Sequence, residues 1–369
     1  MNCYKERGQG AGYLLLSLTL VWLAGSGLAK AVSIDPSHRY YQDGNSNPVF
    51  LIGYYDWAAV PDGYFIDAPS RYSVMILKGA PYKINYIRIS LGVNRMTSST
   101  RPRSWNNRPS PVAFAYLNGK ANLDQWDATF WSGLQNQCSL AQKNRVIVNI
   151  SFFDGVELRS QKGASYGYNN SFWNPKNQAS SFYPAGDYSD RPDAFYRLSD
   201  FTNNTGIGKY QRMVIAQAIS QTAGFNNVMF EVSNEPLGAD ANWIAAVVAY
   251  AKTLTSKPIT QIGGARAGNI DCWSEHDDKT PVQAKGNVAA MAGLGVPAWG
   301  DPDGTALSDP NVSSDDLRRA AWYSFVGGAA GWGGFTVDYW SFGHGFNSTT
   351  AGYYRNLQSF IRDSGVQFW

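Results

Sequence analysis

Cysteine and histidine are scarce in this chain, with three of each among 369 residues. No H-x-x-H, H-E-x-x-H or clustered cysteine motif is present, so the ligand spacing that is typical of zinc sites is missing. A short G-x-G run at 206–208 lacks both a preceding strand pattern and a third glycine, which argues against a dinucleotide site. We therefore expect no metal and no other cofactor.

Long apolar runs are also lacking. The longest, at about residues 11–24, is shorter than the roughly 20 residues that a membrane-spanning helix needs. It follows Lys5 and Arg7 and precedes Ala29-Lys30-Ala31, which is the A-x-A pattern of a signal peptidase site. We predict a signal peptide over 1–31, a mature chain from about Val32, and a secreted protein, extracellular or periplasmic, that is not embedded in a membrane.

Charge of one sign does not accumulate anywhere in the chain. The formal net charge is +3, and acidic and basic residues are interspersed, so the footprint of a nucleic-acid or anionic-membrane binder is missing. By contrast, 13 Trp and 22 Tyr favour a saccharide ligand, because the C–H face of a sugar ring stacks on aromatic side chains. We expect a monomer that binds a neutral oligosaccharide or polysaccharide and no nucleic acid.

Eight short apolar, β-branched runs alternate with helical patterns, as in parallel βα units. They lie at 49–54, 86–91, 146–152, 228–233, 258–263, 269–273, 296–299 and 334–339. Eight such units form a closed barrel. No repeat, linker or low-complexity segment divides the chain, so we predict an α/β protein, with one (β/α)₈ TIM barrel over 32–369.

Amphipathic stripes mark the intervening helices. One predicted stripe comprises Trp126, Phe130, Leu134, Cys138 and Ala141. Cys138 would then lie on a helix and Cys272 on a distant strand, which predicts two unpaired thiols.

A segment at 155–208 interrupts this alternation and contains no convincing helical pattern. Its aromatic residues argue against disorder, and because it follows the third strand it should rise beside the mouth of the barrel. The aromatic residues are Tyr166, Tyr168, Trp173, Phe182 and Tyr183. We predict that this segment forms one wall of a binding cleft.

The fourth predicted strand runs directly into Asn234-Glu235-Pro236. Barrel enzymes carry their catalytic residues at the carboxyl ends of the strands, where Glu235 falls. Glutamate is also rare, with only five in the whole sequence. A capping role for Glu235 beside a helix-starting proline is the structural alternative.

A strand followed by Asn-Glu-Pro resembles the acid/base signature of the clan A glycoside hydrolases, the retaining barrel enzymes that include the cellulase-like family 5. The resemblance implies that Glu235 protonates the leaving oxygen and later deprotonates water. It also implies that Asn234 binds the 2-hydroxyl of the sugar that is cleaved.

Further residues match the clan pattern in part. Arg88 resembles the strand-two arginine that supports the catalytic carboxylates, and we count it among the substrate-binding candidates. Strand alternation also allows it to pair with Glu231 inside the barrel. The remaining candidates for sugar binding at strand ends are Trp340, His276 and Trp57, with Asp154 as a residue that either binds sugar or caps. Trp340 alternatively packs in the core.

The nucleophile is the departure from the pattern, because no Glu follows Glu275 and the clan supplies one at the seventh strand. Asp301 stands near that place and is our preferred nucleophile, with Glu275, Asp303 or no nucleophile as alternatives. If Pro302 has replaced the nucleophile, catalysis is lost; if Asp301 leaves a wider gap between the carboxylates, inversion results.

These features together predict an O-glycosyl hydrolase that cleaves β-glycosidic bonds with retention. The alternative is a glycan-binding barrel that keeps the cleft and Glu235 but lacks a nucleophile. A secreted protein-interaction scaffold is a third possibility, which would require an exposed apolar patch.

Overall fold

The computed structural model describes residues 31–55, 76–91, 113–118, 120–155, 158, 168, 171–179, 192–236, 238–276, 286, 294–301, 313–335 and 348–364. Residues 1–30, which hold most of the predicted signal peptide, lie outside these ranges. Within them, no helix has the length and apolar character that crossing a bilayer requires.

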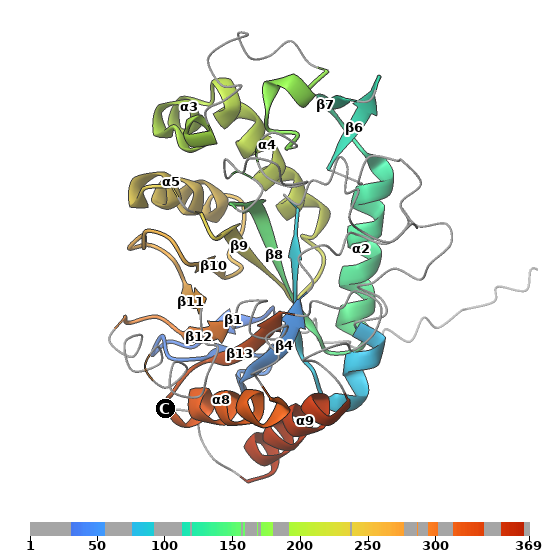
Figure 1. The fold of residues 1–369 in the computed structure, drawn as a ribbon, viewed down its shortest axis with the longest axis vertical. Helices are drawn as coiled ribbons and strands as arrows, with labels where there is room; N and C mark the ends of the chain where they lie inside the picture. Colours follow the sequence, from blue (N-terminus) through green and yellow to red (C-terminus); the bar gives the residue numbers. More distant parts are fainter. Residues whose placement is uncertain are drawn as a thin grey trace, which may run out of the picture.

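Eight parallel strands close into a barrel (Figure 1). In barrel order they are β4 (Leu51–Tyr55), β5 (Tyr86–Ser90), β8 (Ile147–Asp154), β9 (Val228–Asn234), β10 (Ile259–Ile262), β11 (Cys272–His276), β12 (Ala298–Asp301) and β13 (Gly331–Phe335). Each strand pairs with the next along the chain, and β13 pairs with β4. The predicted (β/α)₈ TIM barrel is confirmed.

Two predicted strands were misplaced. The sixth was expected at 269–273, but Asn269 and Asp271 belong to the turn before β11, where they bond to Ala245 O and Ile259 N. The eighth was expected to begin at 334, but β13 begins at Gly331. A Cβ at Gly331 would lie 2.6 Å from the carbonyl oxygen of Leu51, so close packing on β4 selects a glycine that strand propensity disfavours.

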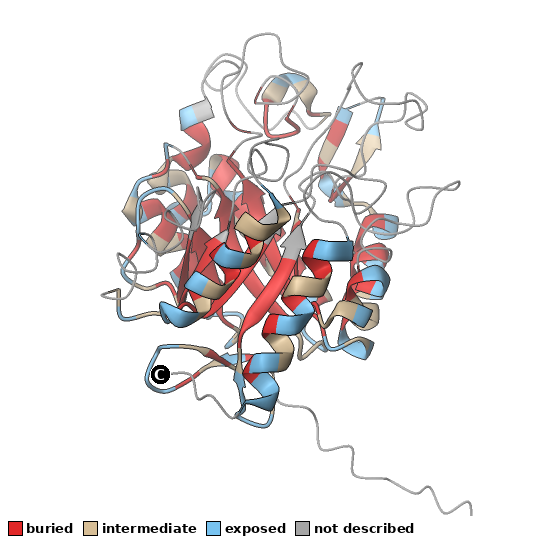
Figure 2. Cartoon of the chain, turned by 60° about the horizontal axis from the view of Figure 1, so that its bottom comes forward, coloured by how far each residue is buried: buried red, intermediate tan, exposed pale blue. Residues whose placement is uncertain are grey.

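Helices cover the outside of the barrel, and Figure 2 shows buried strands surrounded by helices that are buried on one side and exposed on the other. They include α2 (Ala128–Lys143), α3 (Leu198–Asn203), α4 (Gly206–Gln221), α5 (Ala241–Lys252), α8 (Ser314–Val326) and α9 (Ser348–Asp363). Asp127, Asp240 and Ser313 cap the first turns of α2, α5 and α8 with their side chains. Short 3-10 helices lie at η1 (Ala80–Tyr82), η3 (Pro175–Asn177) and η4 (Pro192–Tyr196).

The predicted stripe on α2 is confirmed for Phe130, Leu134, Cys138 and Ala141, which are all buried. Trp126 was wrongly included, because it ends a strand before the helix begins. The prediction of unpaired thiols is confirmed: Cys138 on α2 and Cys272 on β11 are buried and free.

A small antiparallel sheet closes the amino-terminal end of the barrel. It consists of β1 (Ser33–Ile34), β2 (Tyr41–Gln42) and β3 (Pro48–Val49). Tyr41 is fully buried in one apolar cluster with the first residues of four barrel strands, namely Leu51, Tyr86, Ile147 and Cys272. The sheet therefore seals the end opposite to the predicted site.

Two insertions at the other end of the barrel join each other. The hairpin β6 (Phe114–Leu117) and β7 (Lys120–Trp126), which the sequence did not predict, pairs with the long segment through a bridge between Ala121 and Gln178. Phe114 stacks on Trp126 at 4.8 Å between ring centroids and meets Phe172 and Trp173 edge-on. The two insertions therefore pack on each other and extend the main hydrophobic core.

The predicted character of 155–208 needs correction. It contains α3 and two 3-10 helices, where no helix was expected. Tyr168 and Trp173 are buried in the main core, and Trp173 contacts Phe153 of the barrel wall. These two rings hold the segment to the barrel rather than line a cleft, whereas Tyr166, Phe182 and Tyr183 lie outside the described residues.

Candidate active site

The carboxyl ends of β8 and β9 form the best-defined part of the site. Asp154 and Asn234 are register partners at the last positions of these strands, and Glu235 follows directly. Asn234 is buried, whereas Glu235 is partly exposed. A carboxyl group at this place can exchange protons with a ligand at the barrel mouth.

The backbone of Glu235 is left-handed, with φ 39°. This conformation costs a non-glycine residue on the order of 1–3 kcal/mol and is concentrated at functional sites. Gly155 lies against it: the Gly155 amide donates to Asn234 O at 2.6 Å, and a Cβ there would stand 2.0 Å from Glu235 O. Close packing between two strand ends thus fixes the direction in which Glu235 leaves the strand.

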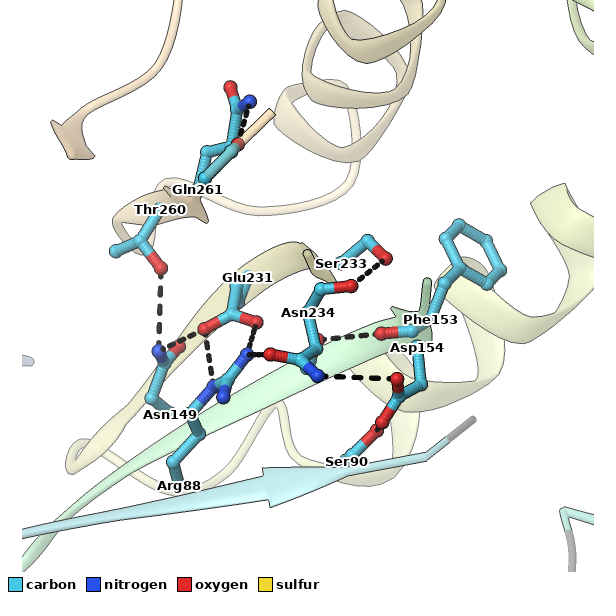
Figure 3. A network of polar contacts seen from close by, with 12 residues as sticks. Arg88, Ser90, Asn149, Phe153, Asp154, Glu231, Ser233, Asn234, Thr260 and Gln261 are labelled. Carbon is cyan, nitrogen blue, oxygen red and sulfur yellow. Dashed lines mark hydrogen bonds and ion pairs between the residues drawn. The ribbon is translucent and has the colours of Figure 1, made fainter. Parts of the chain in front are cut away.

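Beneath Asn234 lies a buried ion pair between Arg88 of β5 and Glu231 of β9 (Figure 3). Arg88 Nε donates to Glu231 Oε2 at 2.7 Å, and Arg88 Nη2 donates to Glu231 Oε1. The side chains are 3% and 0% exposed, so this bidentate pair is removed from solvent. The predicted pairing of Arg88 with Glu231 is confirmed.

The same guanidinium reaches Asn234, because Arg88 Nη2 also donates to Asn234 Oδ1 at 3.0 Å. Arg88 was proposed as a sugar-binding residue. Its burial places it one layer below the mouth, where it contacts Asn234 instead, so its role is to support that side chain. The neighbouring Ser233 is also buried, and its Oγ donates to Asn234 O at 3.1 Å.

Asn149 and Thr260 complete the buried layer and were not predicted. Asn149 Nδ2 donates to Glu231 Oε2 and Tyr86 Oη, both at 3.1 Å, and to Thr260 Oγ1 at 3.3 Å. Both are polar residues within otherwise apolar strands. Because buried polar side chains need hydrogen-bond partners, this pattern could have predicted that they belong to a buried polar network.

Several predicted site residues fall outside the described part of the structure, namely Trp57, Trp340, Asp303 and Pro302. For Glu275, His276 and Asp301 the strand positions are described but the side chains are not. His276 and Asp301 end β11 and β12 and are register partners, so their backbones adjoin at the mouth. The correction to β13 means that its described range ends at Phe335, before Trp340.

A metal site has no support among the residues that the structure describes, since His, Cys, Asp and Glu side chains form no group of three there. The polar groups at the β8 and β9 ends bond to one another instead. They comprise hydrogen-bonding groups and two carboxyl groups, the buried Asp154 and the partly exposed Glu235, an arrangement that suits a polar ligand and proton transfer.

Comparisons with known proteins match this chain by structure alone. No family model and no curated protein sequence matches it. The glycoside hydrolase family 5 mannosidase from Rhizomucor miehei has a TM-score of 0.61 at 12% identity, covering 92% of this chain and all of that one. A putative glycoside hydrolase from Bacteroides vulgatus ATCC 8482 has a TM-score of 0.63 at 12% identity, covering 92% of this chain and 62% of that one.

The endo-1,4-beta-mannanase from Rhizomucor miehei is similar at a TM-score of 0.58 and 11% identity, covering 90% of this chain and 98% of that one. At these identities the likeness establishes the fold. The structural neighbours include members of family 5, which belongs to the clan that the Asn-Glu-Pro motif resembles.

Proposed function

We propose that this chain is a secreted glycoside hydrolase that cleaves β-glycosidic bonds, with Glu235 as its general acid/base. The observation that carries the proposal is the position of Glu235: a partly exposed carboxyl group directly after Asn234, on a strained backbone, at the carboxyl end of a barrel strand. Catalytic carboxylates of barrel enzymes occupy such strand ends.

The proposed mechanism is double displacement. Glu235 gives its proton to the leaving oxygen while Asp301 attacks the anomeric carbon, and Glu235 then takes a proton from the water that releases the sugar. Asn234 binds the 2-hydroxyl, and this hydrogen bond strengthens as charge develops on the ring. Retention requires carboxyl groups about 5–5.5 Å apart, whereas a wider separation would give inversion.

For the substrate we propose a β-linked oligosaccharide or polysaccharide. Several of the structural neighbours are named as mannosidases or as a mannanase, and one mannosidase variant was solved in complex with mannosyl-fructose. β-Mannosides therefore come first in a substrate panel, followed by β-glucans, xylans and galactans. The residues that we assign to sugar contact at the strand ends are Asn234, His276, Trp57 and Trp340.

The test is hydrolysis of this panel by the mature protein, beside Glu235→Gln and Asp301→Asn. Each variant should lose roughly 10²- to 10⁴-fold in kcat/KM on the substrate that is cleaved, because each removes one group from the reaction. Asp363→Asn, an exposed carboxylate on α9, is the control and should keep full activity. The anomer that forms first, measured by proton NMR, separates retention from inversion.

Full activity in Glu235→Gln would refute the proposal. Activity that persists in Asp301→Asn but is lost in Glu235→Gln would move the nucleophile to Glu275 or Asp303. A panel that is bound but never cleaved would favour the glycan-binding barrel.

A further inference from the structure

A second carboxylate, Asp154, lies beside Asn234 and has no part in the acid/base chemistry proposed above. It ends β8 and is 2% exposed. Its Oδ1 accepts a hydrogen bond from Asn234 Nδ2 at 3.2 Å, and Ser90 Oγ lies 3.5 Å from its Oδ2 (Figure 3). Burial of a carboxylate is costly, so its retention next to a substrate-binding residue calls for a function.

The Asn234 side chain is held between two groups of opposite character. Arg88 Nη2 is 3.0 Å from Oδ1 at one end of the amide, and Asp154 Oδ1 is 3.2 Å from Nδ2 at the other. A guanidinium only donates hydrogen bonds, so it must face the amide oxygen, and an ionised carboxylate only accepts, so it must face the amide nitrogen. The donor at one end and the acceptor at the other therefore determine which way round the amide lies.

A flipped amide would have two faults at once. Its NH₂ group would face the guanidinium of Arg88, so that a donor faces a donor. Its oxygen would face the carboxylate of Asp154, so that an acceptor faces an acceptor, and both buried groups would lose their hydrogen bonds. Glu231 matters here as well, because its bidentate bond keeps the guanidinium of Arg88 in place below Asn234.

We infer that Asp154 is a positioning residue that, together with Arg88, locks the Asn234 amide so that its second N–H donates to the 2-hydroxyl oxygen of the sugar. This inference rests on the proposed function, and it adds the direction of the hydrogen bond and the residue that sets it. The carboxylate also polarises the amide that it binds, which strengthens the donor that the sugar meets.

The kinetic test compares substrates with and without the 2-hydroxyl. Aryl β-D-mannopyranoside and β-D-glucopyranoside differ only at C2, so one 2-deoxy glycoside is the counterpart of both. Asp154→Ala should lower kcat/KM roughly tenfold or more on the hydroxylated substrate and less than about threefold on the 2-deoxy substrate. Asp154→Asn, which keeps an acceptor oxygen, should recover most of the loss.

The matched control is Asp124→Ala, which removes a carboxylate that binds Tyr210 Oη at 2.7 Å, outside this network. It should leave the ratio between the two substrates unchanged. Equal losses on both substrates in Asp154→Ala would overturn the inference, because a merely structural role does not distinguish the 2-hydroxyl.

A second measurement does not depend on turnover. The side-chain amide protons of Asn234, assigned by NMR against Asn234→Asp, should exchange slowly in the native chain, faster in Asp154→Ala, and at a rate close to the native one in Asp154→Asn, which keeps an acceptor oxygen. Unchanged exchange in Asp154→Ala would overturn the inference even if no glycoside is cleaved, and a chain that cleaves nothing but shows this change would refute the proposed function alone.

Discussion

Glu235 and Gly155 show how a single contact between two strand ends can fix a site. Glu235 has a left-handed backbone, and the carbonyl of that residue occupies the space that a side chain at Gly155 would need. The buried pair of Arg88 and Glu231 holds the layer below in place. The geometry of the proposed acid/base therefore depends on neighbours that never touch the substrate.

Gly155→Ala should impair function more than folding. The added methyl would stand 2.0 Å from Glu235 O, so the strand end must shift, at a cost of roughly 1–3 kcal/mol in the free energy of unfolding. We expect kcat/KM to fall at least about tenfold, because displacement by about 1 Å is costly in catalysis. Urea unfolding and steady-state kinetics measure the two effects.

Gly268→Ala is the matched control, because a Cβ there meets no atom within 4 Å. It should change neither stability nor kcat/KM beyond experimental error. Unimpaired activity in Gly155→Ala would contradict the assigned packing.

At the scale of elements, the small sheet β1–β2–β3 and the strand ends of the site occupy opposite ends of the barrel. Tyr41 of β2 enters an apolar cluster that contains Trp299, Met229 and Ile262 from three barrel strands. The sheet thus supplies a core layer that the eight short strands lack at that end. In a barrel of this kind, a substitution at the amino-terminal end can lower the stability of the fold without changing the residues at the carboxyl end, where the proposed site lies.

Tyr41→Ala should lower the free energy of unfolding by about 3–5 kcal/mol, the usual cost of deleting a buried aromatic ring. Tyr41→Phe keeps the ring and should stay within about 1 kcal/mol of the native value. Below the unfolding transition, kcat/KM per folded molecule should be the same in both variants as in the native chain. A loss of activity without a loss of stability in Tyr41→Ala would show that the two ends are coupled.

At the scale of the whole molecule, the two cysteines among the described residues, Cys138 and Cys272, test whether the barrel wall is intact. Cys138 lies on the buried face of α2, and Cys272 lies on β11. Burial raises the pKa of each thiol to about 12. Because the thiolate is the reactive form and a raised pKa keeps the thiol protonated, both should be inert near pH 8 in the folded chain.

Intact mass spectrometry after alkylation tests this together with the proposed export. The secreted protein should have the mass of a chain that begins near Val32, take up no alkyl group when native at pH 8, and take up two after denaturation. Uptake by the native chain would contradict the burial of these thiols, and an uncleaved amino terminus would contradict the signal peptide.

The sequence by itself was sufficient for the number and order of the barrel strands and for the position of Glu235. Both follow from local patterns: short β-branched runs alternating with amphipathic stripes, and a polar motif directly after a strand. The same reasoning misplaced β11 and β13, where turn residues and glycines are selected by contacts with Ala245 and Leu51 rather than by strand propensity. It also missed the hairpin of β6 and β7.

Only the tertiary structure decided what the polar residues of the strands do. Arg88, Asp154 and Asn234 come from three strands, and their convergence depends on the register of β5, β8 and β9. Trp173 is an aromatic residue of the type that binds sugars, and the sequence placed it in a cleft wall. In the structure it packs against Phe153 in the core. A local pattern shows which face of a strand is apolar, but contact between residues distant in sequence is fixed only when the barrel closes and sets the register of every strand against its neighbours.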